Sequence, residues 1–135
     1  MNLGPKRVSI PKELSTFFSE EYFDQYPKIT TPQIFHDERG IISNIADGVL
    51  GDVAVITSKP GSVRANHVHK EDWHLSYLVN GEMLYKWQDL DGVFRDILVS
   101  SGNLIYTPPK VPHRMEFNED SCFIAVSKLT RTQEK

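Results

Sequence analysis

Four of the five histidines fall into two clusters whose spacing limits the folds that this chain can adopt. His67 and His69 are separated by one residue, His74 opens the next apolar segment, and His113 follows a Pro-rich segment much later in the chain. Side chains of a strand alternate between its two faces, so His67 and His69 are expected to share a face. Imidazoles from different strands would then meet at one point of a barrel, a donor set that suits a first-row transition metal.

From about residue 33 the chain consists of short apolar segments separated by turn residues, a pattern typical of an all-β sandwich or barrel. Asn80-Gly81 predicts a tight hairpin, because a type I′ turn needs two residues that tolerate positive φ, and Asp91-Gly92 predicts a second hairpin. A jelly roll of two sheets would leave few exposed strand edges. The expected strands are residues 33–36, 41–45, 53–58, 63–69, 74–79, 82–87, 93–99, 104–107, 114–117 and 122–128.

The sequence divides into an N-terminal extension (residues 1–32), a barrel (33–129) and a short tail (130–135). Within the extension, residues 11–23 carry apolar side chains at helical spacing, with a proline at the start, and predict a short helix. This apolar face would pack on the outside of the barrel or on a second subunit. We therefore expect a homodimer.

The composition is that of an ordinary globular domain, with 39% hydrophobic and 24% charged residues. A net charge of −3 and the lack of a Lys/Arg run argue against nucleic acid or anionic lipid as a partner. No apolar stretch is long enough to span a bilayer, and no signal peptide is evident. The single cysteine, Cys122, lies in an apolar run, so a cytoplasmic location is expected.

The glycine and histidine spacing resembles that of the cupin superfamily, whose motifs are G-x5-H-x-H-x3–4-E-x6-G and G-x5-P-x-G-x2-H-x3-N. His74 stands where the family usually has Glu, Lys110 where it has Gly, and Phe117 where it has Asn. The resemblance covers residues 33–129 and implies a cupin double-stranded β-helix, or jelly-roll barrel. The matching positions are Gly61, His67, His69, Gly81, Gly102, Pro108 and His113.

By this resemblance, His67, His69, His74 and His113 would hold a divalent transition metal. Imidazole ligands favour Zn or Fe, with Ni, Mn or Cu as alternatives, over Mg or Ca. Four neutral ligands would leave the charge of the ion uncompensated and would make it a strong Lewis acid.

A second resemblance is to cupins that remodel nucleotide-linked sugars, the 3,5-epimerases and 3,4-ketoisomerases of polysaccharide biosynthesis. Pro60-Gly-Ser-Val-Arg-Ala-Asn-His67 is similar to their P-G-x-x-R-G-x-H, with Ala65 in the place of Gly. The resemblance implies that Arg64 binds an anionic oxygen and that His67 moves a proton. Tyr106, or Tyr77, would be the acid in such a reaction. His69 could be the base in place of His67. The two resemblances compete for His67 and His69, because a histidine that binds a metal is a poor base.

Three functions remain open for a small-molecule substrate. The first is a metal-binding isomerase or epimerase acting on a carbohydrate or sugar nucleotide. The second is a non-haem iron dioxygenase, since cupin sites built from imidazole can bind O₂ beside a substrate. The third is a module that binds a small ligand without turnover.

Overall fold

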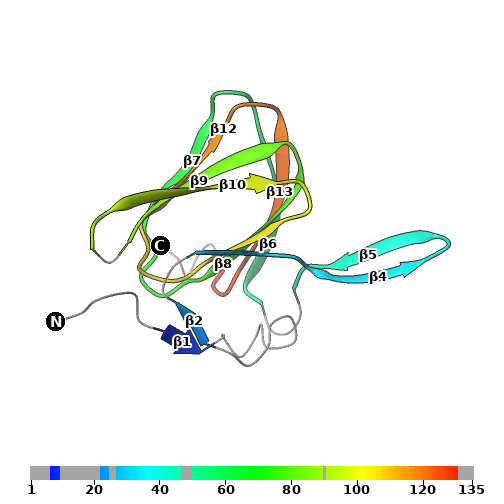
Figure 1. Cartoon of the computed structure of the whole chain (residues 1–135), viewed down its shortest axis with the longest axis horizontal. Helices are drawn as coiled ribbons and strands as arrows, with labels where there is room; N and C mark the ends of the chain where they lie inside the picture. Colours follow the sequence, from blue (N-terminus) through cyan, green and yellow to red (C-terminus); the bar gives the residue numbers. More distant parts are fainter. Residues whose placement is uncertain (1–6, 10–21, 25–26, 47–49, 90, 131–135) are drawn as a thin grey trace.

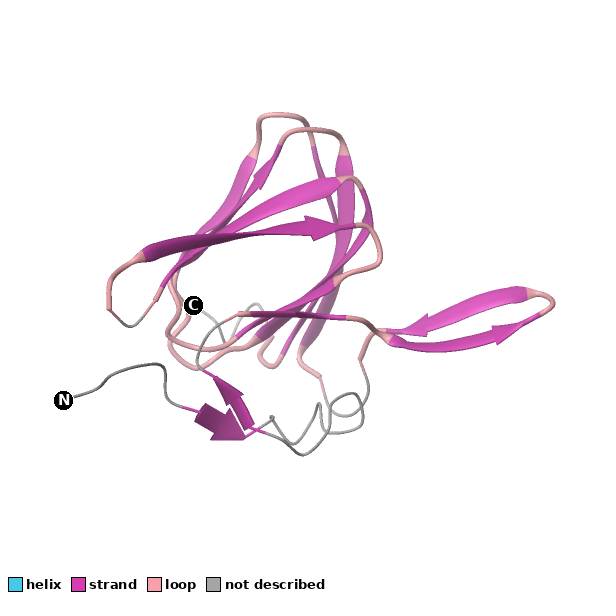
Figure 2. Ribbon diagram, in the orientation of Figure 1, coloured by secondary structure: helices cyan, strands magenta, loops and turns pink. Residues whose placement is uncertain are grey.

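The computed structural model describes residues 7–9, 22–24, 27–46, 50–89 and 91–130, and these residues form β-strands and loops without a helix. Figures 1 and 2 show two sheets that curve around a common interior and a hairpin that extends away from them. The strands are β1 (Arg7–Ser9), β2 (Tyr22–Asp24), β3 (Lys28–Thr30), β4 (Gln33–Asp37), β5 (Gly40–Asn44), β6 (Asp52–Ser58), β7 (Val63–His67), β8 (His74–Asn80), β9 (Glu82–Gln88), β10 (Phe94–Ser100), β11 (Leu104–Thr107), β12 (His113–Phe117) and β13 (Ser121–Ser127). The predicted all-β class is confirmed for these residues.

The barrel consists of two antiparallel sheets. One has the strand order β10-β9-β12-β7 and the other has the order β3-β11-β8-β13-β6. Apart from the β9–β10 hairpin, neighbours in these two sheets are distant in sequence, as a jelly roll requires. The alternation in β9 shows how the interior is filled, since Met83, Tyr85 and Trp87 are buried while the residues between them are partly exposed.

The main core lies among the side chains that these two sheets share. Its largest fully buried members are Tyr85, Phe117, Leu78 and Met83, with Phe123 stacked on Phe117. A smaller apolar cluster contains Trp73, Leu75, Tyr106 and Val126. Both faces of β11 are therefore covered, which is why all four of its residues are buried.

The predicted hairpin at Asn80-Gly81 is wrong, whereas the one at Asp91-Gly92 is confirmed. Strands β8 and β9 belong to different sheets, so the chain crosses between the sheets at Gly81. Gly81 has φ of 92°, and a Cβ there would lie 2.6 Å from the Cβ of Ser121, so glycine is required for both conformation and space. By contrast, β9 and β10 pair in register, and the Asp89 carboxylate accepts the Asp91 and Val93 N–H groups in the connecting turn.

The predicted helix over residues 11–23 falls mainly outside the described residues. Its last two positions, Tyr22 and Phe23, belong to strand β2, which pairs with β1. The predicted helix is therefore wrong at this end, because the backbone there is extended and hydrogen-bonded to a second strand. No helix among the described residues is long and apolar enough to cross a membrane.

Candidate functional site

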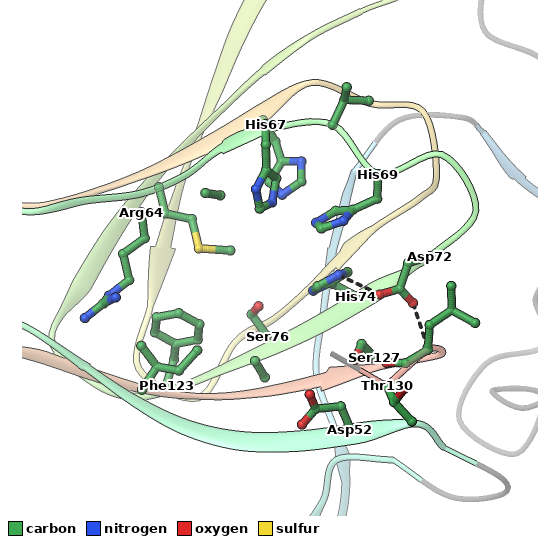
Figure 3. Close-up of a pocket in the computed structure, with 17 residues that line it drawn as sticks. Asp52, Arg64, His67, His69, Asp72, His74, Ser76, Phe123, Ser127 and Thr130 are labelled. Atoms are coloured by element: carbon green, nitrogen blue, oxygen red, sulfur yellow. Dashed lines mark hydrogen bonds and ion pairs between the residues drawn. The ribbon is translucent and has the colours of Figure 1, made fainter. Parts of the chain in front are cut away.

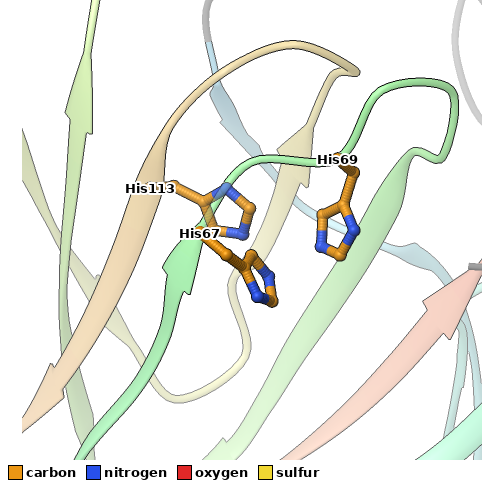
Figure 4. A group of neighbouring side chains, drawn as sticks. All are labelled: His67, His69 and His113. Carbon is orange, nitrogen blue, oxygen red and sulfur yellow. The ribbon is translucent and has the colours of Figure 1, made fainter. Parts of the chain in front are cut away.

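Three histidines converge at one end of the barrel interior. His67 ends β7, His69 lies in the following loop, and His113 begins β12. The ring centroids are 4.1 Å apart for His67 and His69, 5.1 Å for His67 and His113, and 5.6 Å for His69 and His113 (Figure 4). One ring nitrogen from each lies within 4.8 Å of the other two, so the three rings can share one metal ion.

The route by which His67 and His69 meet differs from the predicted one. The strand ends at His67, so simple alternation along residues 63–69 is not the cause. Ala65 and Asn66 both have positive φ, of 65° and 60°. The pairing of β7 with β12 skips Asn66, because His113 pairs with His67 and the next residue, Arg114, pairs with Ala65. Such a β-bulge turns the side chains that follow it, and here it directs His67 toward the cluster.

The loop after β7 is held against the loop before β12 by a backbone hydrogen bond. The Lys110 N–H donates to the His69 carbonyl oxygen over 2.7 Å. Lys110 has φ of 68°, in the left-handed region that glycine adopts without strain. Lys110 and Ala65 are the two positions where this chain lacks a glycine of the motifs it resembles, so the backbone conformation is retained where the residue type is not.

His113 is 5% exposed, and its Nδ1 lies 2.9 Å from the Val111 carbonyl oxygen. A carbonyl only accepts, so Nδ1 carries the proton and Nε2 presents its lone pair. Burial, with a smaller effect of the neighbouring His67 and His69, lowers the pKa of His113 from 6.5 to about 4, so the ring stays neutral at neutral pH. A neutral ring with a fixed tautomer is the form that binds a metal.

Tyr85 supports the His113 ring from inside the core. The two rings stack with centroids 5.8 Å apart, and the Tyr85 hydroxyl lies 2.7 Å from Thr107 Oγ1. Burial raises the pKa of the Tyr85 phenol well above its ordinary value, so it remains a neutral packing group.

His74 lies beside the three-histidine cluster rather than within one group of four. Its ring stacks on His69 with centroids 4.3 Å apart. It forms a second group of candidate ligands with His69 and Asp72. Asp72, which lies between His69 and His74 in the sequence, is buried, and its Oδ2 lies 3.0 Å from His74 Nε2. The sequence signal for Asp72 was a carboxylate placed between two of the clustered histidines.

A pocket of about 630 Å³ opens onto both groups (Figure 3). In this view Arg64 and Asp72 lie at opposite ends of the pocket. The apolar part of the lining would shield a bound molecule from water. The lining residues are Asp52, Ile56, Arg64, Ala65, His67, Val68, His69, Asp72, His74, Ser76, His113, Met115, Phe123, Ala125, Ser127, Leu129 and Thr130.

Of the other two predicted site residues, Arg64 lies at the pocket and Tyr106 lies in the core. Arg64 lines the pocket, where its Nε donates to Ser58 Oγ over 2.7 Å and its Nη2 donates to the Thr57 carbonyl over 2.6 Å. Tyr106 is 1% exposed, packs with Trp73 and Leu75, and is not among the described residues that line the pocket. Arg64 and His67 are thus brought together, and Tyr106 is not.

The donor set fits a divalent metal ion. It combines three imidazoles, one of them held in its neutral form, with a buried carboxylate at the edge of the group. Nitrogen donors of this kind are typical of Fe, Zn, Ni or Cu sites in proteins.

Comparison with solved structures confirms the cupin-type fold. The sugar 3,4-ketoisomerase QdtA from Thermoanaerobacterium thermosaccharolyticum, in complex with TDP, aligns with a TM-score of 0.66 and 16% identity, over 80% of this chain and 85% of that chain. The dTDP-6-deoxy-D-glucose-3,5-epimerase RmlC from Legionella pneumophila aligns with a TM-score of 0.67 and 15% identity, over 96% of this chain and 74% of that chain. At these identities the likeness concerns the fold.

Curated proteins with similar sequences carry the names of dioxygenases. Acireductone dioxygenase of Bacillus pumilus is 31% identical over 67 residues, which are 50% of this chain and 38% of that protein. The 3-hydroxyanthranilate 3,4-dioxygenase of Xanthomonas oryzae pv. oryzae is 31% identical over 85 residues, which are 63% of this chain and 47% of that protein. The chain thus spans less than half the length of these relatives.

A family model extends over a larger part of the chain. The model described as the ARD/ARD′ family matches residues 59–135, which are more than half of the sequence. The matched region contains all four clustered histidines, Asp72, and most of the residues that line the pocket, which come from β7, β8, β12, β13 and adjoining loops. The chain therefore belongs to the ARD/ARD′ family of cupins.

Proposed function

We propose that this protein is a metal-dependent cupin dioxygenase that acts on a small organic molecule. The observation that carries the proposal is the convergence of His67, His69 and His113 at the pocket, with His113 held neutral by burial and oriented by its bond to Val111. Family membership and the names of the curated relatives support oxygen chemistry at such a site.

In this proposal His67, His69 and His113 hold a divalent ion, with His74 as the fourth ligand. The chemistry that a bound redox-active ion supplies is the activation of O₂, so that both oxygen atoms enter the substrate. Iron is the first expectation for this role, and Ni, Mn or Cu are the alternatives to be separated by metal analysis. Zn has no redox chemistry, so a zinc-loaded protein would favour the isomerase instead.

The remaining pocket residues would bind and orient the substrate. Ile56, Met115 and Phe123 provide an apolar wall that keeps water from the reacting centre. Arg64, already held in place by Ser58 and Thr57, would bind an anionic oxygen of the substrate at the far end of the pocket. The names of the relatives suggest acireductone and 3-hydroxyanthranilate as the first compounds to test.

The test is oxygen uptake by protein purified without a histidine tag and reconstituted with Fe(II). We expect uptake that depends on iron and on one compound of the panel, and its loss, by at least about 100-fold, in His113→Ala. His36→Ala is the matched control, because His36 is an exposed histidine in the β4–β5 hairpin. Iron-loaded protein that consumes no oxygen with any compound, or His113→Ala protein with full activity, would contradict the proposal.

The second candidate is a sugar-nucleotide isomerase or epimerase of polysaccharide biosynthesis. It is favoured by Arg64 and His67 lining one pocket, and by the fold shared with sugar-nucleotide enzymes. In that reaction His67 would move the proton and Arg64 would hold the enolate oxygen, while the predicted acid Tyr106 lies in the core. Deuterium incorporation from D₂O into a dTDP-4-keto-6-deoxy sugar without oxygen uptake would favour it over the dioxygenase.

The third candidate, ligand binding without turnover, would appear as a small molecule that co-purifies unchanged.

We also propose a cytoplasmic homodimer. The β4–β5 hairpin supports the dimer, because Ile34, Phe35, Ile41 and Ile42 are 52% to 65% exposed on it. A second support is β6, an edge strand whose Val53 and Val55 are also exposed.

A further inference from the structure

A carboxylate is buried beside the histidine cluster, although aspartates are rarely buried unless they are paired. Asp72 is 2% exposed, and each of its oxygens has its own partner. Oδ1 accepts the Leu129 N–H over 2.9 Å, and Oδ2 lies 3.0 Å from His74 Nε2. The carboxylate therefore joins the segment after β13 to the first residue of β8.

These contacts define the state of the His74 ring. Asp72 Oδ2 and His74 Nε2 are within ion-pair distance, without the alignment of a hydrogen bond. A carboxylate only accepts, so this contact favours a proton on Nε2, and Nδ1 of a neutral ring would then keep the lone pair. The stacking on His69, with an interplanar angle of 23°, restricts the ring on its other side. A histidine whose second nitrogen is bonded to a carboxylate is a common arrangement for orienting a metal ligand.

We propose that Asp72 is a positioning residue that holds His74 with Nδ1 as its metal-binding atom. This inference rests on the proposed function, because it assumes an ion at the histidine cluster. Asp72 does not itself bind the ion. Its effect on the ion passes through His74.

Asp72 could also have a purely structural role, because it holds the segment after β13 through the Leu129 N–H. A substitution that keeps this contact can separate that role from the orientation of His74. Further bonds fix the same segment, since Ser127 Oγ donates to the Leu129 carbonyl over 2.9 Å and the Lys128 N–H donates to the Trp73 carbonyl over 3.3 Å. In Asp72→Asn the amide oxygen can still accept the Leu129 N–H, but an NH₂ donor then faces His74. The substitution keeps the size of the side chain and replaces the acceptor that faces His74 Nε2 with a donor.

The experiment compares Co(II) binding to the wild type, Asp72→Asn, His74→Ala and the double variant, with a chelator competition assay and the visible Co(II) spectrum as readouts. We expect Asp72→Asn to weaken Co(II) binding by about 10- to 100-fold and to shift the spectrum, without changing the far-UV circular dichroism. In the His74→Ala background the same substitution is expected to have no further effect. Asp52→Asn is the control, because Asp52 is another carboxylate of the same pocket.

Equal weakening in the presence and absence of His74 would overturn the inference, because Asp72 would then act on the ion directly. Unchanged Co(II) affinity and spectrum in Asp72→Asn would also overturn it. Should Asp72→Asn not fold, ¹⁵N NMR of the wild-type imidazoles gives the answer, with a protonated His74 Nε2 expected and a protonated Nδ1 contradicting the inference. None of these readouts needs turnover, so the absence of oxygen uptake would count against the dioxygenase alone.

Discussion

At the scale of single residues, the burial of His113 links the site to the pH dependence of stability. Its pKa is about 4 in the folded protein and near 6.5 in the unfolded chain, so between these values the unfolded chain binds more protons. The lowered pKa therefore stabilises the folded state above pH 6.5, and this contribution is lost as the pH falls toward 4. At its full extent it amounts to roughly 3 kcal/mol.

We expect the metal-free protein to unfold at a lower urea concentration at pH 5 than at pH 7.5, and His113→Gln to remove most of this difference. Urea titrations monitored by tryptophan fluorescence at both pH values measure it. The exposed His36 again provides the control, as His36→Gln should keep the wild-type difference. The same pH dependence in His113→Gln as in the wild type would show that other groups are responsible.

At the scale of elements, Gly81 controls the crossing from one sheet to the other. Gly81→Ala places a Cβ against Ser121 and strains a backbone with φ of 92°. Gly61 is the matched control, because it has φ of 83° and nothing within 4 Å of an added Cβ. We expect Gly61→Ala to cost about 1 kcal/mol of unfolding free energy and Gly81→Ala to cost at least about 2 kcal/mol more. Equal costs would mean that the crossing has room for a methyl group.

The bulge before His67 provides a second test at this scale. Ala65 adopts φ of 65°, which a β-branched residue tolerates poorly. Ala65→Val is expected to lower the unfolding free energy by about 2 kcal/mol and to weaken Co(II) binding, because the bulge directs His67. Ala65→Gly should retain the Co(II) affinity of the wild type. Tight Co(II) binding by Ala65→Val would show that the cluster forms without this backbone conformation.

The same elements show what the sequence could and could not predict. Strand alternation and turn residues predicted β6, β8, β9 and β10 closely, because burial on one face leaves a period of two in the sequence. The bulge at Ala65 and Asn66 has no such mark, since it depends on pairing with a strand far along the chain. Asn80-Gly81 has the composition of a hairpin turn, but the local residues do not specify which sheet receives the next strand.

In the candidate site, too, some features could be predicted from the sequence and others depend on contacts between distant segments. The spacing of His67, His69 and His113 predicted their convergence, although the backbone achieves it through a bulge and a loop. The burial of Asp72 could not be predicted, because it depends on the Leu129 N–H from the opposite end of the domain. Tyr106 illustrates the converse, since nothing local distinguishes a tyrosine that lines a pocket from one that fills a core.

At the scale of the whole molecule, the β4–β5 hairpin extends from the barrel with apolar side chains exposed (Figure 1). An isolated two-stranded hairpin is marginally stable in water, so contact with a second copy would stabilise it. We expect the intact chain to sediment as a dimer and Phe35→Ser/Ile42→Ser to sediment as a monomer in analytical ultracentrifugation. Val63→Ser, an equally exposed position on β7, should remain dimeric. A monomeric wild type would refute the predicted dimer.

The bond between Lys110 and His69 has a consequence for the order of assembly. The three rings come together only after β12 has docked beside β7, which brings together strands that are far apart in the sequence. If the proposed ion is bound by all three rings, it would bind late in folding, and its binding would indicate that the chain has reached its native arrangement. Molecules in which β12 has not yet paired with β7 would lose the metal to a competing chelator. The fraction of metal-loaded protein would therefore measure the fraction of molecules that have completed folding.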